Sequence, residues 1–166
     1  MDPRWLDEDE RAAWLRLVAV VELLPGVLDA QLRRDSALSH FDYFVLSMLS
    51  EAPERTLRMT GLAHRTSATL PRLSHAVQRL EARGLVERFP CPQDRRATNA
   101  RLMASGWDTV VAAAPGHVGA VRDNVIDPLS REQLAQLTAI GDALLARIDP
   151  DGRMTALLEP RASEPA

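Results

Sequence analysis

TLPRLSHAVQRLEARGLVERFPCPQDRRATNARLM, residues 69–103, is the stretch of the sequence that decides the fold. Apolar residues in its first half recur at three- and four-residue steps, which is the spacing of a helix that packs on a core. These residues are Leu70, Leu73, Val77 and Leu80. Gly84 then ends the helix, and strand candidates at 85–89 and 99–103 flank the polar connection CPQDRRAT. The stretch therefore predicts an amphipathic helix followed by a β-hairpin with arginines at its tip.

Two more helices are predicted immediately before this stretch. Residues 40–51 carry a core-facing apolar stripe, and residues 59–65 form a helix short enough to need tertiary support. Thr69 is the expected N-cap of the helix that follows. The order is then helix, short helix, helix, strand, wing and strand, which is the order of a winged helix-turn-helix over residues 39–104.

Long helices are expected on both sides of this unit. Residues 7–35 share one apolar stripe that stays in phase across Pro25–Gly26, so we expect a kink there. Residues 105–126 form the next helix, with a second kink site at Pro115–Gly116, and residues 130–148 form the last one. The fold class is mainly α (α+β): helical regions at 7–38 and 105–149, the winged unit at 39–104, and a flexible tail at 150–166.

Charge is distributed unevenly along the chain. The net charge of the 166 residues is −3, yet the segment from Arg55 to Arg101 holds ten arginines and three acids, a local charge of +7. The rest of the chain therefore carries −10. A basic segment in an otherwise acidic protein predicts a local surface for a polyanion, and the acidic remainder helps to orient it.

The segment RLEARGLVERFPCPQDRR resembles the end of the recognition helix and the wing of the MarR family of bacterial transcription regulators. In that family the helix ends in Arg-Leu-Glu-x-x-Gly-Leu/Trp-Val, and the wing carries Asp-Arg-Arg or Asp-x-Arg, which here is Asp94-Arg95-Arg96. The resemblance covers residues 7–149. It implies a homodimer in which the long N- and C-terminal helices interdigitate with a second subunit.

The first half of the predicted recognition helix fits the major groove of duplex DNA. Arg72 is the candidate for a bidentate contact with guanine, whereas His75 and Gln78 are candidates for contacts with bases or phosphates. The hydroxyl groups of Thr69 and Ser74 suit phosphate. Pro71 and Arg79 complete the face that we expect to point outward. The alternative is a solvated basic face.

The resemblance adds roles for the wing. It implies that Arg96 enters the minor groove, that Asp94 supports it through a salt bridge, and that Arg95 lies near the DNA backbone. Effectors of the family are often aromatic or phenolic, so Trp14 and Tyr43 are candidates for an effector site, with core packing as the alternative for Trp14.

Cys91 is the single cysteine, so an intrachain disulfide is excluded. It lies at the base of the wing near arginines, and such a thiol is a candidate redox sensor. The alternative is a small residue in an extended turn.

Other classes of function lack a pattern in this sequence. The histidines and acids show no metal-ligand spacing, and no grouping of nucleophile and base or phosphate loop supports catalysis, so neither a cofactor nor an enzyme is expected. No apolar run approaches the ~20 residues of a membrane span. The N-terminus is acidic, unlike a secretory signal. We expect a soluble cytoplasmic protein.

Taken together, these patterns predict a MarR-like repressor that binds a pseudo-palindromic operator in double-stranded DNA as a homodimer and is released by a small molecule. Two alternatives stay open at this point. One is a winged-helix module that binds an acidic protein partner, and the other is a regulator that senses oxidants through Cys91.

Overall fold

The computed structural model describes residues 3–92 and 94–154, and for Arg95 the backbone alone. The elements follow in the order α1 (Glu8–Ser36), α2 (His40–Glu51), η1 (Pro53–Arg55), β1 (Thr56–Arg58), α3 (Met59–Arg65), α4 (Leu70–Ala82), β2 (Val86–Cys91), β3 (Asp94–Leu102), α5 (Ala104–Val121), η2 (Arg122–Ile126) and α6 (Arg131–Ile148). The mainly α winged helix-turn-helix is confirmed. Of the expected tail, residues 155–166 lie outside the described residues.

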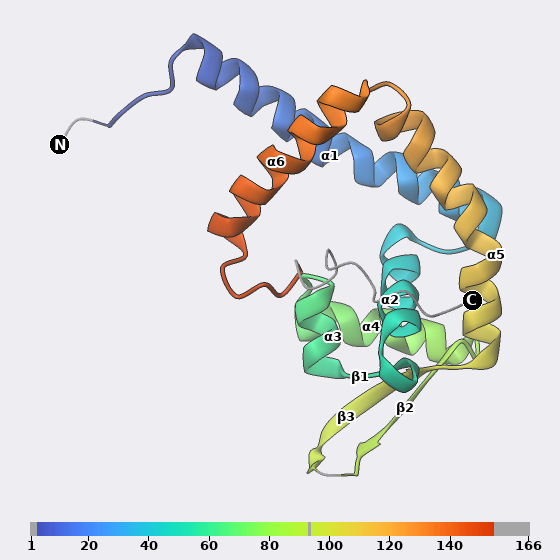
Figure 1. Ribbon diagram of the computed structural model, residues 1–166. Helices are drawn as coiled ribbons and strands as arrows, with labels where there is room; N and C mark the ends of the chain where they lie inside the picture. Colours follow the sequence, from blue (N-terminus) through green and yellow to red (C-terminus); the bar gives the residue numbers. More distant parts are fainter. Residues whose placement is uncertain (1–2, 93, 155–166) are drawn as a thin grey trace, which may run out of the picture.

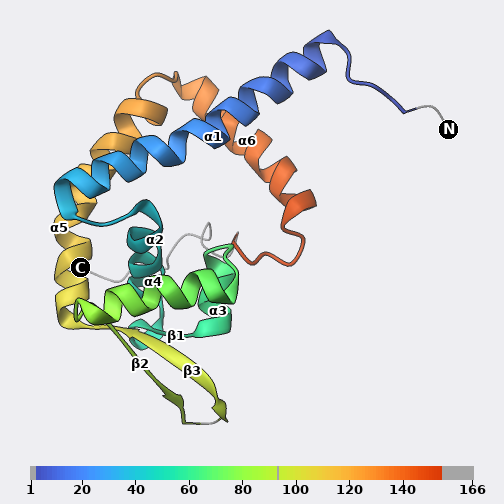
Figure 2. The same ribbon diagram turned by 180° about the vertical axis from the view of Figure 1, so that it is seen from behind.

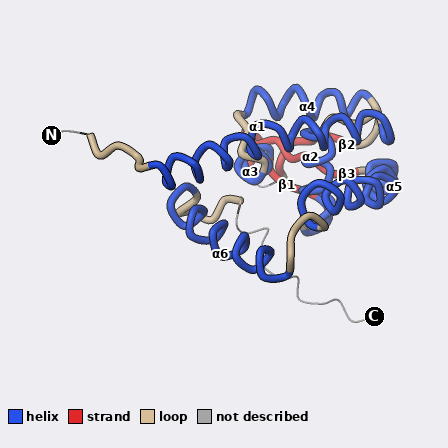
Figure 3. The backbone as a smooth tube through the Cα atoms, turned by 90° about the horizontal axis from the view of Figure 1, so that it is seen from above, coloured by secondary structure: helices blue, strands red, loops and turns tan. Residues whose placement is uncertain are grey.

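The core lies where α2, α3 and α4 meet the sheet and the C-terminal end of α1. Its largest fully buried side chains are leucines and valines from each of these elements. Figures 1 and 2 show α2, α3 and α4 grouped above the β2–β3 hairpin, which projects away from the helices as a wing. From above, the N-terminal half of α1 and most of α6 lie to one side of this group (Figure 3).

The sheet has three antiparallel strands in the order β1-β3-β2. Sequence reasoning missed β1. It also made the hairpin too short, because β2 extends to Cys91 and β3 begins at Asp94, both closer to the turn than predicted. The pairing of β2 with β3 continues outward to Pro90 opposite Thr98, and a register shift precedes Cys91 opposite Asp94. Pro90 is tolerated there because β2 is an edge strand, where a missing N–H group breaks no ladder on its outer side.

Both predicted ends of α4 are confirmed: Thr69 caps its start, and Gly84 follows its end with a φ of +69°. Ser130 and Gln133 form a capping box at the start of α6. Ser105, by contrast, does not cap α5. Its hydroxyl group donates to the carbonyl oxygen of Gly84 at 2.6 Å, and so ties the start of α5 to the end of α4.

Both long helices pass through their prolines. α1 continues across Pro25 without a break, and the kink expected there stays a prediction. α5 also continues across Pro115. The helix becomes irregular only later, at Arg122–Ile126, where a π-helical turn (η2) replaces the regular hydrogen bonds. The N-terminus of α1 is capped: Asp7 and Glu10 form a capping box, and the Arg11 backbone N–H donates a hydrogen bond to the carbonyl oxygen of Asp7.

An ion pair that is supported by three hydrogen bonds joins α4 to the wing. Glu81 accepts hydrogen bonds from the Arg88 guanidinium at 2.7 and 3.0 Å and from the Arg88 backbone N–H at 3.0 Å. The hydrogen bond from the Arg88 side chain is the main reason, and the one from the Arg88 backbone the next, why the pKa of Glu81 lies below its ordinary value. The bridge fixes the direction in which β2 leaves the helix.

We predict that Gly106→Ala destabilises the fold. A Cβ at this position would collide with the carbonyl oxygen of Leu85 and would lie 2.6 Å from Cδ1 of Leu102. Overpacking of this kind costs about 1–3 kcal/mol of the free energy of unfolding, measured by urea denaturation at a fixed protein concentration. Gly61→Ala in α3 is the control, since its Cβ would meet nothing within 4 Å and should leave stability unchanged or raised by up to about 1 kcal/mol. Equal stability of the two variants would contradict the close contact of α5 with Leu85.

We further predict that Glu81→Gln changes how stability depends on pH. A carboxyl group with a lowered pKa in the folded state contributes stability above its unfolded pKa, and that stability is lost as the pH falls through the folded pKa. The free energy of unfolding of the wild type should therefore exceed that of Glu81→Gln most at neutral pH, and the gap should narrow below about pH 4. The control, Glu22→Gln on the exposed side of α1, should follow the wild type. A gap that stays constant from pH 7 to acid would contradict the role of this bridge.

Candidate nucleic-acid interface

The outward face of α4 presents Pro71, His75 and Gln78, and all three side chains are exposed. The helix begins at an exposed cap, because the Thr69 hydroxyl accepts a hydrogen bond from the backbone N–H of Arg72 at 3.4 Å. The remaining free N–H groups of the first turn point out of the same end of the helix. This end offers hydroxyl, imidazole and amide groups on a rigid element, as a surface that contacts a nucleic acid would.

Arg72 and Arg79 lie on the flank of α4 that faces α2. The Arg72 guanidinium lies over the ring of Phe41, 4.2 Å from its centroid, and an Arg79 nitrogen lies 2.8 Å from a carboxylate oxygen of Asp42. Arg83, further along the same flank, donates to the carbonyl oxygen of Ala37 at 3.0 Å. Both arginines are exposed, as predicted for the outward side of the helix, and their guanidinium groups in addition contact the first turn of α2.

Ser74 lies on the opposite flank of α4 and is half-buried. It helps to line a groove of about 320 Å³ between α3, α4 and the wing, in which three arginines meet. These arginines are Arg58, Arg88 and Arg96. The groove therefore combines a hydroxyl group with cationic side chains, which is a chemistry that suits phosphate.

The wing tip is organised by Asp94. Its carboxylate accepts a hydrogen bond from the backbone N–H of Arg96 at 3.1 Å, so it braces the turn through the main chain. This bond goes to the backbone instead of the Arg96 guanidinium, which differs from the expected salt bridge. The Arg96 side chain is exposed. The predicted contact of Arg95 concerns a side chain outside the described part of the structure.

Cys91 is 2% exposed, at the end of β2. Its sulfur accepts a hydrogen bond from the Arg58 guanidinium at 3.4 Å. Sequence reasoning placed this thiol at the base of the wing beside other arginines, but the register puts it at the outer end of β2, opposite Asp94. The pairing of β1 with β3, which the sequence did not predict, brings Arg58 within reach of it. Burial of the sulfur limits the access of oxidants, so redox sensing stays a prediction without structural support.

The two candidate effector residues lie in different surroundings. Tyr43 is buried in α2 with its ring 4.6 Å from that of His117 on α5, and burial raises the pKa of its phenol. Trp14 on α1 is 54% exposed. Tyr43 is thus a packing residue at the contact of α2 with α5, while Trp14 belongs to an exposed apolar surface.

The junction of α1, α2 and α5 also holds two histidines. His40 and His117 have ring centroids 6.2 Å apart, and burial lowers the pKa of both. Asp29 on α1 accepts a hydrogen bond from the backbone N–H of His40 at 2.8 Å. The pKa of Asp29 is lowered chiefly by the hydrogen bond from Arg33 and next by this backbone bond. This junction therefore fixes the first turn of α2 to the C-terminal part of α1.

Other kinds of site find no support in the described residues. Within 3–92 and 94–154, no three side chains of His, Cys, Asp or Glu come together in a group that could hold a metal ion. None of the helices there combines the length and the apolar character that crossing a membrane requires.

Sequence reasoning missed Phe41, Asp42 and Arg58 as residues of this region. Phe41 belongs to the apolar stripe predicted for residues 40–51, and it does pack against the core while only partly buried. Its second contact, with Arg72, depends on how α2 crosses α4, which helical periodicity cannot reveal. Arg58 precedes α3 without any motif of its own.

Comparisons with known proteins agree with this geometry. A model of the MarR family matches residues 39–97. The crystal structure of Sco3205, a MarR family transcriptional regulator from Streptomyces coelicolor in complex with DNA, is similar with a TM-score of 0.83 and 43% identity, covering 87% of this chain and 91% of that one. A search of curated protein sequences found no significant match.

Two further crystal structures show the same likeness. AbsC, a MarR family transcriptional regulator from Streptomyces coelicolor, has a TM-score of 0.80 and 37% identity over 91% of this chain and 99% of that one. The transcriptional regulator BldR from Sulfolobus solfataricus has a TM-score of 0.70 and 25% identity over 84% of this chain and 98% of that one. The fold, the wing motif and these likenesses together show that the chain belongs to the MarR family of transcriptional regulators.

Proposed function

We propose that this regulator binds a pseudo-palindromic operator in double-stranded DNA as a homodimer and represses transcription. The observation that carries the proposal is the pairing of an exposed helix end with an arginine-bearing wing, held together by the Glu81–Arg88 bridge. The solved complex of Sco3205 with DNA supports the same partner for this chain.

On this proposal each projection has its own task. The first turns of α4 enter the major groove, with Arg72, His75 and Gln78 toward the bases and with Thr69 and Ser74 toward phosphates. The wing carries Arg96 along the adjacent minor groove, where its guanidinium is attracted by the negative potential. Asp94 keeps the turn in shape through the backbone of Arg96.

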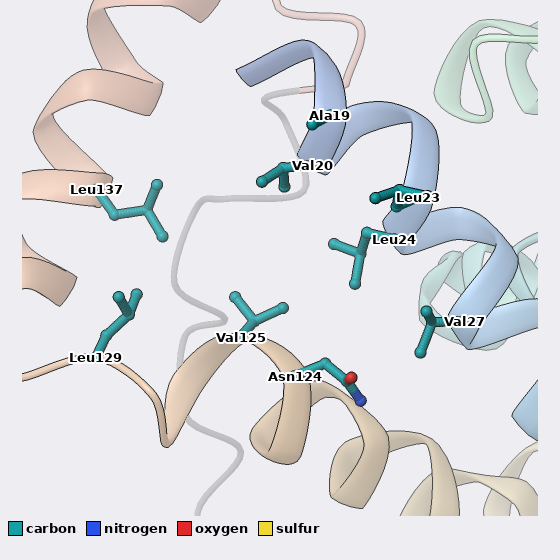
Figure 4. Close-up of a pocket in the computed structure, with 9 residues that line it drawn as sticks. All are labelled: Ala19, Val20, Leu23, Leu24, Val27, Asn124, Val125, Leu129 and Leu137. Carbon is teal, nitrogen blue, oxygen red and sulfur yellow. The ribbon is translucent and has the colours of Figure 1, made fainter. Parts of the chain in front are cut away.

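The dimer is supported by an apolar groove that one chain leaves open. Side chains from α1 and from the α5–α6 connection face each other across it, as Figure 4 shows. Its lining is Ala19, Val20, Leu23, Leu24, Val27, Asn124, Val125, Leu129 and Leu137. A contiguous apolar surface with several large exposed side chains, such as Val20, Leu23 and Val27, is typical of a protein interface. We propose that residues 7–38 and 105–149 form the dimerisation region around the DNA-binding unit at 39–104.

We also propose that a small aromatic or phenolic molecule releases the repressor from DNA. Such an effector acts only if it binds one arrangement of the two DNA-binding units better than the other. Two recognition helices have to lie about 34 Å apart to enter successive major grooves, so a ligand that favours another spacing lowers operator affinity.

We predict different outcomes for two arginine variants in DNA binding. Arg96→Ala should weaken binding to all duplexes about equally and make the salt dependence shallower, because it removes a contact that is independent of sequence. Arg72→Ala should cost about 1–3 kcal/mol on the operator and relax the sequence preference. Fluorescence anisotropy over a salt series measures both effects.

The control for both variants is Arg131→Ala at the start of α6, which should bind DNA as the wild type does. Wild-type affinity in Arg96→Ala would remove the wing from the proposed interface. Binding of the wild-type protein that is independent of salt would contradict DNA as its partner and favour a protein partner for the winged unit.

We predict that Leu23→Asp converts the dimer to monomers. Leu23 is 69% exposed in one chain, so a carboxylate here leaves the protomer intact but becomes buried without a partner in the dimer. Sedimentation velocity measures the change. The matched control is Leu70→Asp on α4. Leu70 belongs to the stripe predicted to face the core, but it is 47% exposed in the structure, so this variant should fold and stay dimeric. A dimeric Leu23→Asp variant would show that the groove is not the interface.

A further inference from the structure

The first turn of α2 holds two arginines of the recognition helix by different means. Phe41 offers the face of its ring to the Arg72 guanidinium at 4.2 Å, and Asp42, the next residue, offers its carboxylate to Arg79 at 2.8 Å. Neither residue lies on α4 itself. We propose that Phe41 is a positioning residue for operator recognition, which orients Arg72 toward a base edge. The proposal rests on the proposed function in DNA binding.

The mode of contact decides what Arg72 can still do. A guanidinium whose carbon lies over an aromatic ring is attracted by the ring face without a hydrogen bond to an oxygen acceptor, so its N–H donors are not taken up by an acceptor in the protein. These donors stay free for a bidentate contact with guanine, which needs two parallel N–H groups from one planar fork. The Phe41 ring therefore orders the arginine without occupying the atoms that recognise a base.

Arg79 is held differently, and the contrast defines the role of each neighbour. The Asp42 carboxylate takes an N–H donor of Arg79, and Asp42 is almost entirely buried while more than half of the Arg79 side chain remains exposed. A donor that is bonded to a carboxylate within the protein is not available to DNA unless that bond breaks. Asp42 therefore fastens α4 to α2, whereas Phe41 leaves its arginine ready for recognition.

The support beneath Phe41 is rigid. Part of its ring packs against the hydrophobic core, so its position is fixed by the packing of α2. Ser39 caps this helix by accepting a hydrogen bond from the Asp42 backbone N–H at 3.0 Å. The His40 backbone N–H is bonded to Asp29 on α1. A side chain stacked on such a support loses less conformational entropy when it binds a base, because it is already ordered.

The test is a double-mutant cycle with Phe41→Leu and Arg72→Ala. The probes are a duplex that the wild-type protein selects from a pool with a randomised centre, and a scrambled duplex of the same composition. Phe41→Leu should weaken binding to the selected duplex about ten-fold, since the stacking contribution of each half-site is lost. Its affinity for the scrambled duplex should not change. In the Arg72→Ala background, Phe41→Leu should have no further effect on either duplex.

Two more variants separate positioning from a general loss of packing. Phe41→Tyr keeps the ring face and should restore binding to the selected duplex. Phe44→Leu removes a partly buried ring from the same helix, one that packs on the same core and stacks with no described arginine. It should bind both duplexes as the wild type does. The free energy of unfolding of each variant is measured by urea denaturation, so that binding is compared at equal folded fraction.

Three results would overturn the proposal. The first is a loss in Phe41→Leu that is equal on the two duplexes. The second is a loss that persists in the Arg72→Ala background, and the third is wild-type affinity in Phe41→Leu. In each case the proposed function stands if the wild-type protein still selects a duplex. If the wild type selects none, DNA binding itself fails, and this result is distinct from the other three.

Discussion

The bridge between Glu81 and Arg88 is the interaction on which the geometry of the interface depends. A helix and a hairpin loop can contact one DNA duplex together only if their separation and direction are fixed. Arg88 achieves this with three hydrogen bonds to one carboxylate, two from its guanidinium and one from its backbone. Because the backbone takes part, the start of β2 is held as firmly as the side chain. The Gly84 turn before it has the positive φ that lets the chain reverse at this point.

Several arginines of the basic segment are engaged in ion pairs within the fold, whereas others keep their guanidinium groups open to a partner. Arg79, Arg88 and Arg101 are paired with carboxylates, and these pairs connect elements of the fold. Arg72 is stacked on a ring and Arg96 is exposed at the wing tip. The local charge of +7 therefore overstates the number of guanidinium groups that can release counterions from DNA. Much of the basic character of this segment stabilises the frame that presents the remaining arginines.

Sequence reasoning succeeded where one local pattern determined the outcome. Helical periodicity is sufficient to find α2 and α4, and the cap at Thr69 is a contact within one turn. α2 nevertheless buries more than its predicted stripe, because Asp42, Tyr43 and Leu46 are buried as well. Strand β1 could not be found in this way, since its three residues become a strand only by pairing with β3, more than forty positions later. The contacts of Arg72 and Arg79 were missed for a related reason: they depend on how α2 crosses α4, and the sequence of α2 gives no sign of its contact with these arginines.

The α1–α2 junction, a short connection at residues 37–39, links the proposed dimer interface to the recognition helix. Leu38 is buried in the core, Ala37 adopts a left-handed conformation, and its carbonyl oxygen accepts a hydrogen bond from Arg83 at the end of α4. Asp29 on α1 binds the start of α2 from the other side. A movement of α1 against α2 has to break one of these bonds or carry α4 with it. In the proposed dimer, the spacing of the two recognition helices is therefore coupled to the packing of α1 through these hydrogen bonds and the apolar contacts of Leu32 and Leu38.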